Sequence, residues 1–191
     1  GFDNIPYDVP AFKIKPNDLP KEEVLGRRIR YALSALGLHE CISLRFTSAL
    51  NTAKVFGEPN DADPRSKPAK LLNALSDELG CVPTSLIPIL LKSVAENEKN
   101  RPGSIRLFEN GKAQFQNAER QNERDPGFTE KQVLCAVIAG HYKMEALDDK
   151  PRKVEFADIK GIAVSLFKRL GIAAEIRPAE KPELFLHPGT Q

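Results

Sequence analysis

An almost unbroken apolar run over residues 132–142 constrains the fold of this chain more than any other feature. Its centre reads Val-Leu-Cys-Ala-Val-Ile-Ala-Gly, and polar or charged residues bound it on both sides. A run of this length that is rich in β-branched residues is typical of a strand buried on both faces. It is too short to cross a membrane, which takes roughly 20 apolar residues in a helix. We therefore expect a sheet with this strand at its centre.

Three amphipathic segments can cover such a sheet. Residues 19–37, 85–98 and 155–170 repeat apolar side chains in steps of three and four, as the buried face of a helix does. A shorter helix is expected to end near Phe56. Capping residues stand at the predicted ends, namely Asp18 with Pro20, Ser48, and Thr84 or Ser85 at the starts, and Gly37 and Gly171 at the stops.

Shorter alternating stretches predict the remaining strands. We expect them at residues 40–47, 70–73, 104–109, 112–116, 173–177 and 184–187. Asn110-Gly111 separates two of them, and Asn-Gly is the strongest two-residue signal for a hairpin. The mixed order of helices and strands favours the α+β class, with an antiparallel sheet flanked by helices.

The length of 191 residues suits one substantial domain. Residues 1–18 are interrupted by prolines and predict an extended linker, so the domain is expected to occupy residues 19–191. The first residues lack the basic start and apolar stretch of a signal peptide. We expect a cytoplasmic protein without a membrane partner.

Residues that carry chemistry are scattered along the chain. The three cysteines, Cys41, Cys81 and Cys135, form no CxxC pair, and the three histidines are isolated in sequence. Reduced, partly buried thiols and no metal site are therefore predicted. A net charge of +2, spread among acids, argues against extended RNA binding by this chain alone. An RNA-binding module remains an alternative that the salt dependence of tRNA affinity would reveal.

Six short strings, in order and across nearly the whole chain, resemble the β subunit of bacterial phenylalanyl-tRNA synthetase. They are residues 1–6, 71–76, 84–88, 105–111, 158–161 and 186–189. The motif residues to which the resemblance gives structural roles are Asn73, Ser76, Thr84, Ser85, Arg106, Phe108, Glu109, Asp158, Lys160, Gly161, His187, Pro188 and Gly189. The chain departs from the family at Pro83 and Thr190, where arginine is usual, and at Ala74, where proline is usual. These departures leave the subunit contacts at those positions open.

The resemblance implies a module with a class II aminoacyl-tRNA synthetase-like fold, cut short at its C-terminal end. Such a module would support aminoacylation by packing on the catalytic α subunit, in an assembly with two copies of each chain. ATP and magnesium would serve the whole enzyme, and tRNA would bind the whole assembly.

Strand geometry argues against an active site in this module. Class II sites use an Arg-x-Glu pair, because side chains two apart share a face of a strand. Here Arg106 and Glu109 are three apart and should point to opposite faces. No catalytic, cofactor-binding or metal-binding residue is predicted, and Asp158 with Lys160 is interpreted as a structural pair. The alternative is a freestanding class II synthetase-like enzyme, or a protein that binds an amino acid or adenylate.

The first helix is the candidate for a subunit interface, because residues outside its apolar stripe can face a partner. The interface candidates are Arg27, Arg28, Tyr31, Leu86 and Pro88.

Overall fold

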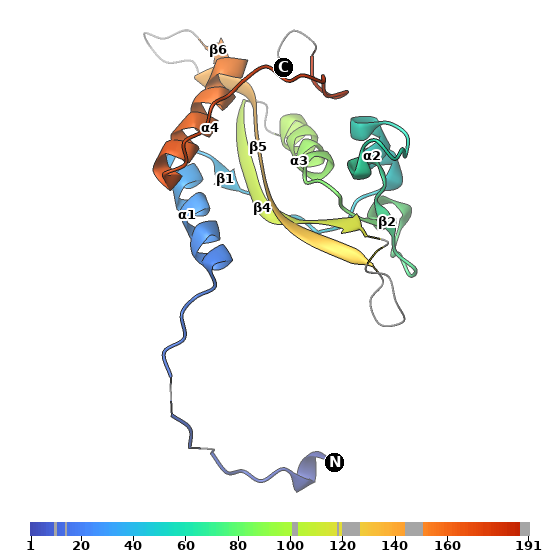
Figure 1. Cartoon of the computed structure of the whole chain (residues 1–191), viewed down its shortest axis with the longest axis vertical. Coiled ribbons are helices and arrows are strands. Elements are labelled where there is room, and N and C mark those ends of the chain that lie inside the picture. Colours follow the sequence, from blue (N-terminus) through green and yellow to red (C-terminus); the bar gives the residue numbers. More distant parts are fainter. Residues whose placement is uncertain are drawn as a thin grey trace.

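Two pairs of helices enclose a curved sheet whose two long strands run through the domain. The computed structural model describes residues 1–9, 11–13, 15–100, 103–117, 119, 127–143 and 151–187. Figure 1 shows α1 (Lys21–Ala35) and α4 (Phe156–Leu170) on one side of the long strands, with α2 (Ala49–Phe56) and α3 (Ile87–Asn100) on the other. The domain is therefore a mixed α+β arrangement. Residues 1–9, 11–13 and 15–20 are exposed and run away from it.

The sheet has the strand order β1-β4-β5-β6. The long strands β4 (Ser104–Gln116) and β5 (Phe128–Lys143) are antiparallel throughout. In contrast, β1 (His39–Glu40) runs parallel to β4, so the sheet is mixed: the expected antiparallel pairing holds for the long strands and fails at β1. β6 (Arg152–Lys153) pairs with β5 only at His141 and Lys143. Within the described residues, positions 128–139 of β5 thus form an outer edge of the sheet.

A pair of short strands lies on the α2 side of the sheet (Figure 1). β2 (Ala69–Lys70) and β3 (Cys81–Val82) form a second, antiparallel pair. Three short 3-10 helices complete the described elements: η1 (Phe2–Asn4), η2 (Pro64–Ser66) and η3 (Asp77–Leu79).

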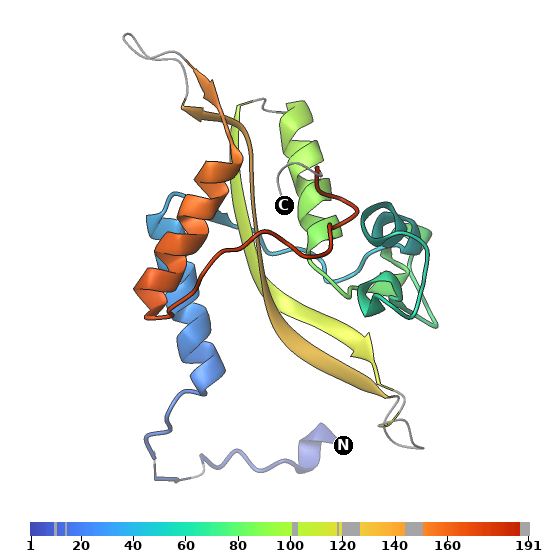
Figure 2. The same ribbon diagram turned by 45° about the horizontal axis from the view of Figure 1, so that its top comes forward.

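The strand predicted at residues 132–142 is confirmed and extends further at both ends. It is less buried than expected, and the side chain of Leu134 is 36% exposed. Leu134 lies on the face of the long strands that α1 and α4 cover, and these helices cover only one end of that face, as Figure 2 shows. The same face carries the main core cluster, in which Phe108 packs against Leu33, Leu38 and Leu166.

The hairpin predicted at Asn110-Gly111 is wrong, because both residues lie inside the continuous strand β4, opposite Leu134 and Val133. Packing explains why these two residue types occur there. Asn110 is buried, accepts a hydrogen bond from Gln132 and lies against Gly26 of α1. On the opposite face a Cβ atom at Gly111 would come within 3.2 Å of Leu86. The pair allows close approach of neighbours from both sides.

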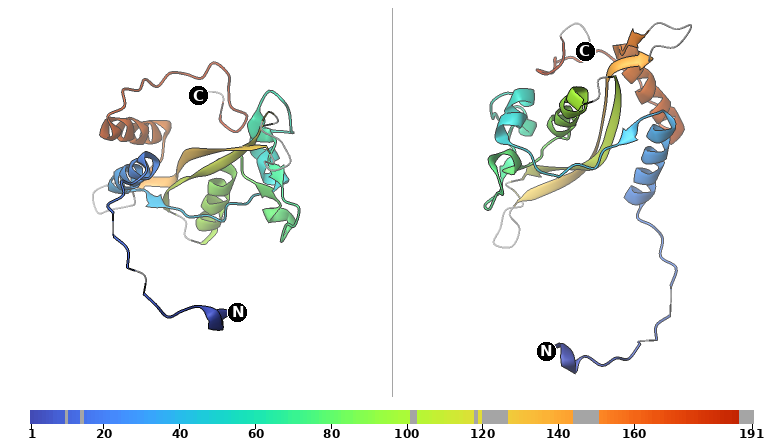
Figure 3. Two further views of the ribbon diagram at one scale, coloured as in Figure 1. Left: turned by 60° about the horizontal axis from the view of Figure 1, so that its bottom comes forward. Right: turned by 180° about the vertical axis from the view of Figure 1, so that it is seen from behind.

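The helix predictions hold better than the short-strand predictions. Ser48 caps α2 by accepting a hydrogen bond from the backbone N–H of Asn51, and Gly171 ends α4 in the left-handed conformation. The cap expected from Asp18 is wrong, because α1 begins after Pro20 without a side-chain cap. The strands expected at 173–177 and 184–187 do not form, and only His39–Glu40 pairs as a strand near the predicted 40–47 segment. After α4 the chain crosses over the sheet to reach α2 (Figure 3).

Candidate functional site

The segment that joins β1 to α2 turns its apolar side chains outward. Ile42, Leu44 and Phe46 are 89%, 70% and 40% exposed, whereas Thr47 is 4% exposed. The alternation expected of a strand is present in part: Cys41, Ser43 and Thr47 face the protein, whereas Arg45 is exposed. Contiguous exposed apolar side chains mark protein–protein contacts more often than solvent-facing surfaces. We call Ile42, Leu44 and Phe46 the apolar stripe.

Residues 41–47, which we call the stripe segment, are held at both ends by backbone hydrogen bonds. The N–H of Cys41 donates to the carbonyl of Phe108 over 2.7 Å. At the other end Thr47 and Cys81 exchange two bonds of 2.9 and 2.8 Å. Between these ends, Ser43 donates to the carboxylate of Glu109 from its backbone N–H (3.3 Å) and from its hydroxyl (2.8 Å). The segment therefore lies beside β4, tied to it by one side chain.

A groove of about 290 Å³ runs between the apolar stripe and α3. Pro88 and Ile89 contribute apolar walls, and Lys92 at its rim forms an ion pair with Glu78. The stripe and this groove together offer a partner an apolar surface with charged edges, which is the usual composition of a protein interface.

The interface candidates from the sequence divide between surface and interior. In α1, Tyr31 is 77% exposed, Arg28 is exposed and Arg27 pairs with Glu23 at 2.8 Å. The prediction that Leu86 faces a partner is not supported, because this residue is 2% exposed and packs against Gly111. Pro88 is buried and lines the groove beside the apolar stripe. The stripe itself was missed, although the alternation of apolar and polar residues was visible in the sequence.

Arg106 and Glu109 lie on opposite faces of β4. Arg106 donates to the carbonyl of Tyr142 over 2.6 Å, and its guanidinium lies 4.7 Å from the centre of that ring. Glu109 is buried on the face that carries Gly111 and Leu86. The two side chains therefore do not line one pocket.

The other cations that the structure describes on β4 and β5 are also engaged. Lys112 binds Glu130, and this hydrogen bond holds the pKa of the Glu130 carboxyl below its usual value. Lys131 lies 5.3 Å from the centre of the Phe115 ring. A phosphate-binding cleft needs cations that converge on open space. These side chains are instead matched to partners within the protein.

Asp158 organises the start of α4. It accepts a hydrogen bond from the backbone N–H of Glu155 and completes a capping box with that residue. Two further hydrogen bonds, of 3.0 and 2.8 Å, come from the Arg152 guanidinium and hold the pKa of Asp158 below its usual value. The partner of Asp158 is thus Arg152, and the pairing expected with Lys160 is wrong.

The cysteines are free thiols in the structure. Burial, aided by the nearby charge of Glu109, raises the pKa of the Cys135 thiol to about 11. Cys41 lies 3.4 Å from the hydroxyl of Ser43. Among the described residues no group of three or more histidine, cysteine, aspartate or glutamate side chains is arranged to hold a metal ion.

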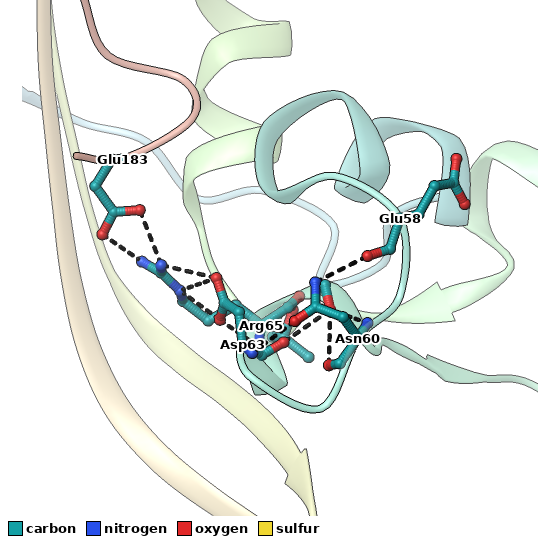
Figure 4. Close-up of polar contacts among 7 residues, drawn as sticks. Glu58, Asn60, Asp63, Arg65 and Glu183 are labelled. Atoms are coloured by element: carbon teal, nitrogen blue, oxygen red, sulfur yellow. Dashed lines mark hydrogen bonds and ion pairs between the residues drawn. The ribbon is translucent and has the colours of Figure 1, made fainter. Parts of the chain in front are cut away.

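A network around Arg65 fastens the chain beyond α4 to the α2 side, and no sequence pattern predicts it. Figure 4 shows the guanidinium between Asp63 and Glu183, with Asn60 and Glu58 in the same turn. Its Nη2 atom lies 2.8 Å from Asp63 and 2.9 Å from Glu183. The guanidinium also stacks over the ring of Phe56, which meets Phe185 edge-on. The hydrogen bond from Arg65 holds the pKa of Asp63 below its usual value.

The remaining motif residues occupy varied positions. Thr84 donates to the carbonyl of Arg65, and the hydroxyl of Ser85 accepts from the N–H of Ile87 at the start of α3. Pro83 is buried, and its carbonyl accepts from the N–H of Gln114. Exposed positions are held by Asn73, Ser76, Lys160, Gly161 and His187. Pro188, Gly189 and Thr190 lie outside the described residues.

No helix within the described parts of the chain combines the length and the apolar character that a membrane span requires.

Comparison with known proteins gives one consistent result. The family described as the phenylalanyl tRNA synthetase beta chain CLM domain matches residues 5–191. The phenylalanine–tRNA ligase beta subunit of Syntrophotalea carbinolica is 30% identical over 189 residues, covering 99% of this chain and 23% of that protein. The corresponding subunit of Dehalococcoides mccartyi is 34% identical over 185 residues, covering 96% of this chain and 21% of that protein. The chain thus spans less than a quarter of the length of these relatives.

Solved structures share the fold at low sequence identity. Two structures of pyrrolysyl-tRNA synthetase from Desulfitobacterium hafniense are 19% identical to this chain and cover 81% of it. Their TM-scores are 0.53 and 0.55, and the match covers 46% and 49% of those chains. The likeness shows that this chain shares its fold with part of a synthetase structure.

Proposed function

Because this chain belongs to the family of phenylalanyl tRNA synthetase beta chain CLM domains, we propose that it is a synthetase-like module that supports aminoacylation without an active site of its own. In this proposal, residues 19–191 form a class II synthetase-like unit, residues 1–18 are a linker, and the unit packs on the catalytic α subunit. The whole enzyme, with two copies of each chain, would act in the cytoplasm. It would bind tRNA, and its ATP and magnesium would bind outside this module.

The apolar stripe carries the proposal. Three large side chains that alternate outward along residues 42–46 leave apolar area in water, and each would gain free energy by burial against a partner. The groove beside α3 extends this surface, and exposed Tyr31 in α1 is a further candidate contact. A second argument is the pairing of Arg106, Lys112 and Lys131 within the protein, which supports a structural role over nucleotide binding.

The decisive experiment places a charge in the stripe of the whole β subunit. We expect Leu44→Glu to weaken its binding to the α subunit by about a hundredfold, because a carboxylate would have to be buried unpaired. Leu72→Glu is the matched control, since Leu72 is fully exposed in a loop outside the stripe and its change should leave binding intact. Equal binding of both variants would refute the proposal.

Calorimetry with the isolated chain tests the enzyme alternative. Binding of ATP or phenylalanine, together with phenylalanine-dependent pyrophosphate exchange, would assign catalysis to this module and overturn the supporting role. We expect neither.

A further inference from the structure

Glu109 is a buried carboxylate, and within the described residues its side-chain oxygens accept hydrogen bonds from Ser43 alone. It is 4% exposed, and its two oxygens accept from the N–H and the hydroxyl of Ser43. Among the described residues it forms no ion pair, although Arg106 lies three positions earlier on the same strand. Across the sheet it faces Cys135, and Leu86 packs beside it on Gly111.

Such a carboxylate adds little to the stability of the domain. Transfer of a carboxylate from water to the interior is costly, and only partial compensation comes from hydrogen bonds to a neutral donor. An apolar side chain of similar size would meet a suitable environment beside Leu86 and Cys135. The role of the carboxylate is therefore to hold the stripe segment through Ser43.

The stripe segment needs this side chain because it has no strand partner in its middle. Backbone pairing holds Cys41 and Thr47, whereas Ser43 finds its acceptor in the Glu109 side chain. Residues one apart in an extended chain point in opposite directions. When Glu109 draws Ser43 inward, its neighbours Ile42 and Leu44 must turn outward.

We infer that Glu109 is a positioning residue for subunit docking, which presents the apolar stripe to the partner by holding Ser43. The inference rests on the proposed function for its docking step. Its structural step, the ordering of residues 42–46, concerns this chain alone and can be measured without a partner.

The test compares Glu109→Leu and Ser43→Ala with the wild-type β subunit. In both variants we expect hydrogen exchange at residues 42–46 to speed up and α-subunit affinity to fall. The change should be about tenfold in Ser43→Ala, which loses one charge-assisted hydrogen bond, and at least as large in Glu109→Leu, which loses two. The melting temperature of Glu109→Leu should equal or exceed that of wild type, which a merely structural residue would not show. Ser43→Thr keeps the hydroxyl, so its hydrogen-exchange rate at residues 42–46 and its affinity for the α subunit should equal those of wild type.

The outcomes separate the two proposals. Unchanged exchange at 42–46 in Ser43→Ala overturns the positioning role, even if Glu109→Leu fails to fold. Faster exchange with unchanged α-subunit affinity also overturns it, because the ordered stripe would then be irrelevant to docking. If the wild-type subunit itself does not bind the α subunit, the proposed function fails, and the exchange rates still decide whether Glu109 orders the segment.

Discussion

Glu183 accepts two hydrogen bonds from the guanidinium of Arg65, which lies 118 residues earlier in the chain. Next to this contact, the rings of Phe56 and Phe185 are 5.8 Å apart and nearly perpendicular. Together they attach the chain after α4 to α2, although that tail forms no strand within the described residues. One arginine thus replaces the sheet pairing that the sequence predicts for residues 184–187.

Replacing Arg65 should release this tail. In Arg65→Met we expect cleavage by a protease within residues 172–183 to become about tenfold faster, because the bidentate ion pair and the stacking on Phe56 are both lost. Limited proteolysis with mass spectrometry measures the rate. Arg177→Met is the control, since it removes only the exposed pair with Glu175. Equal cleavage of both variants would show that Arg65 does not fasten the tail.

A side chain at Gly140 should disrupt the sheet. Its φ angle is +78°, and a Cβ atom there would lie 1.7 Å from the carbonyl oxygen of Gly103. We expect Gly140→Ala to reduce the free energy of unfolding by roughly 2–4 kcal/mol, measured by urea denaturation.

The matched control for Gly140 is Gly161→Ala in α4. No atom lies within 4 Å of the new Cβ, so alanine should increase stability by about 0.5–1 kcal/mol through its higher helix propensity. A loss of stability in this variant would contradict the prediction, because it would show that alanine does not fit at position 161 of the 158–161 motif.

Acid should remove the contribution of Asp158 to stability. Its pKa is lowered in the folded protein by Arg152, so the contribution is present above the unfolded pKa of about 3.9 and is lost as the pH falls through the lower folded pKa. Asp158→Asn should therefore melt below wild type at pH 7, and the two melting temperatures should converge in strong acid. Lys160→Met should melt like wild type at both pH values. A loss in that variant equal to that of Asp158→Asn would restore the pairing of Asp158 with Lys160.

Cys135 should resist alkylation in the folded protein. With a pKa of about 11, only about 0.1% of this thiol is ionised at pH 8, against roughly a quarter for an unperturbed cysteine. Modification by iodoacetamide, followed by peptide mass spectrometry, should be about a hundredfold slower than in the same protein unfolded by urea. Similar rates in the two states would contradict the burial of this thiol.

The elements with strong local patterns could be predicted from the sequence. The periodic segment at 155–170 forms α4 at Phe156–Leu170, and the apolar run at 132–142 lies within β5. Ser48 caps its helix as expected, because a cap depends on neighbours within one turn.

Features decided by distant contacts could not be predicted. Asn110-Gly111 carries a strong hairpin signal, but packing against Gly26 and Leu86 keeps both residues inside a strand. Asp158 was expected to pair with a helix neighbour, whereas Arg152, just before the helix, reaches it instead. The apolar stripe shows the alternation of a strand, and only the folded chain reveals that Ser43 has an acidic partner inside and that Ile42 and Leu44 therefore face outward.

The outer edge of β5 has a practical consequence for anyone who purifies this module alone. Along 128–139, the backbone amides and carbonyls that do not pair with β4 have no other strand partner among the described residues, and such edges can pair with another molecule and nucleate aggregates. The charged side chains of Glu130 and Lys131 disfavour stacking of like copies there. Substituting both with threonine should therefore lower the concentration at which the module begins to precipitate.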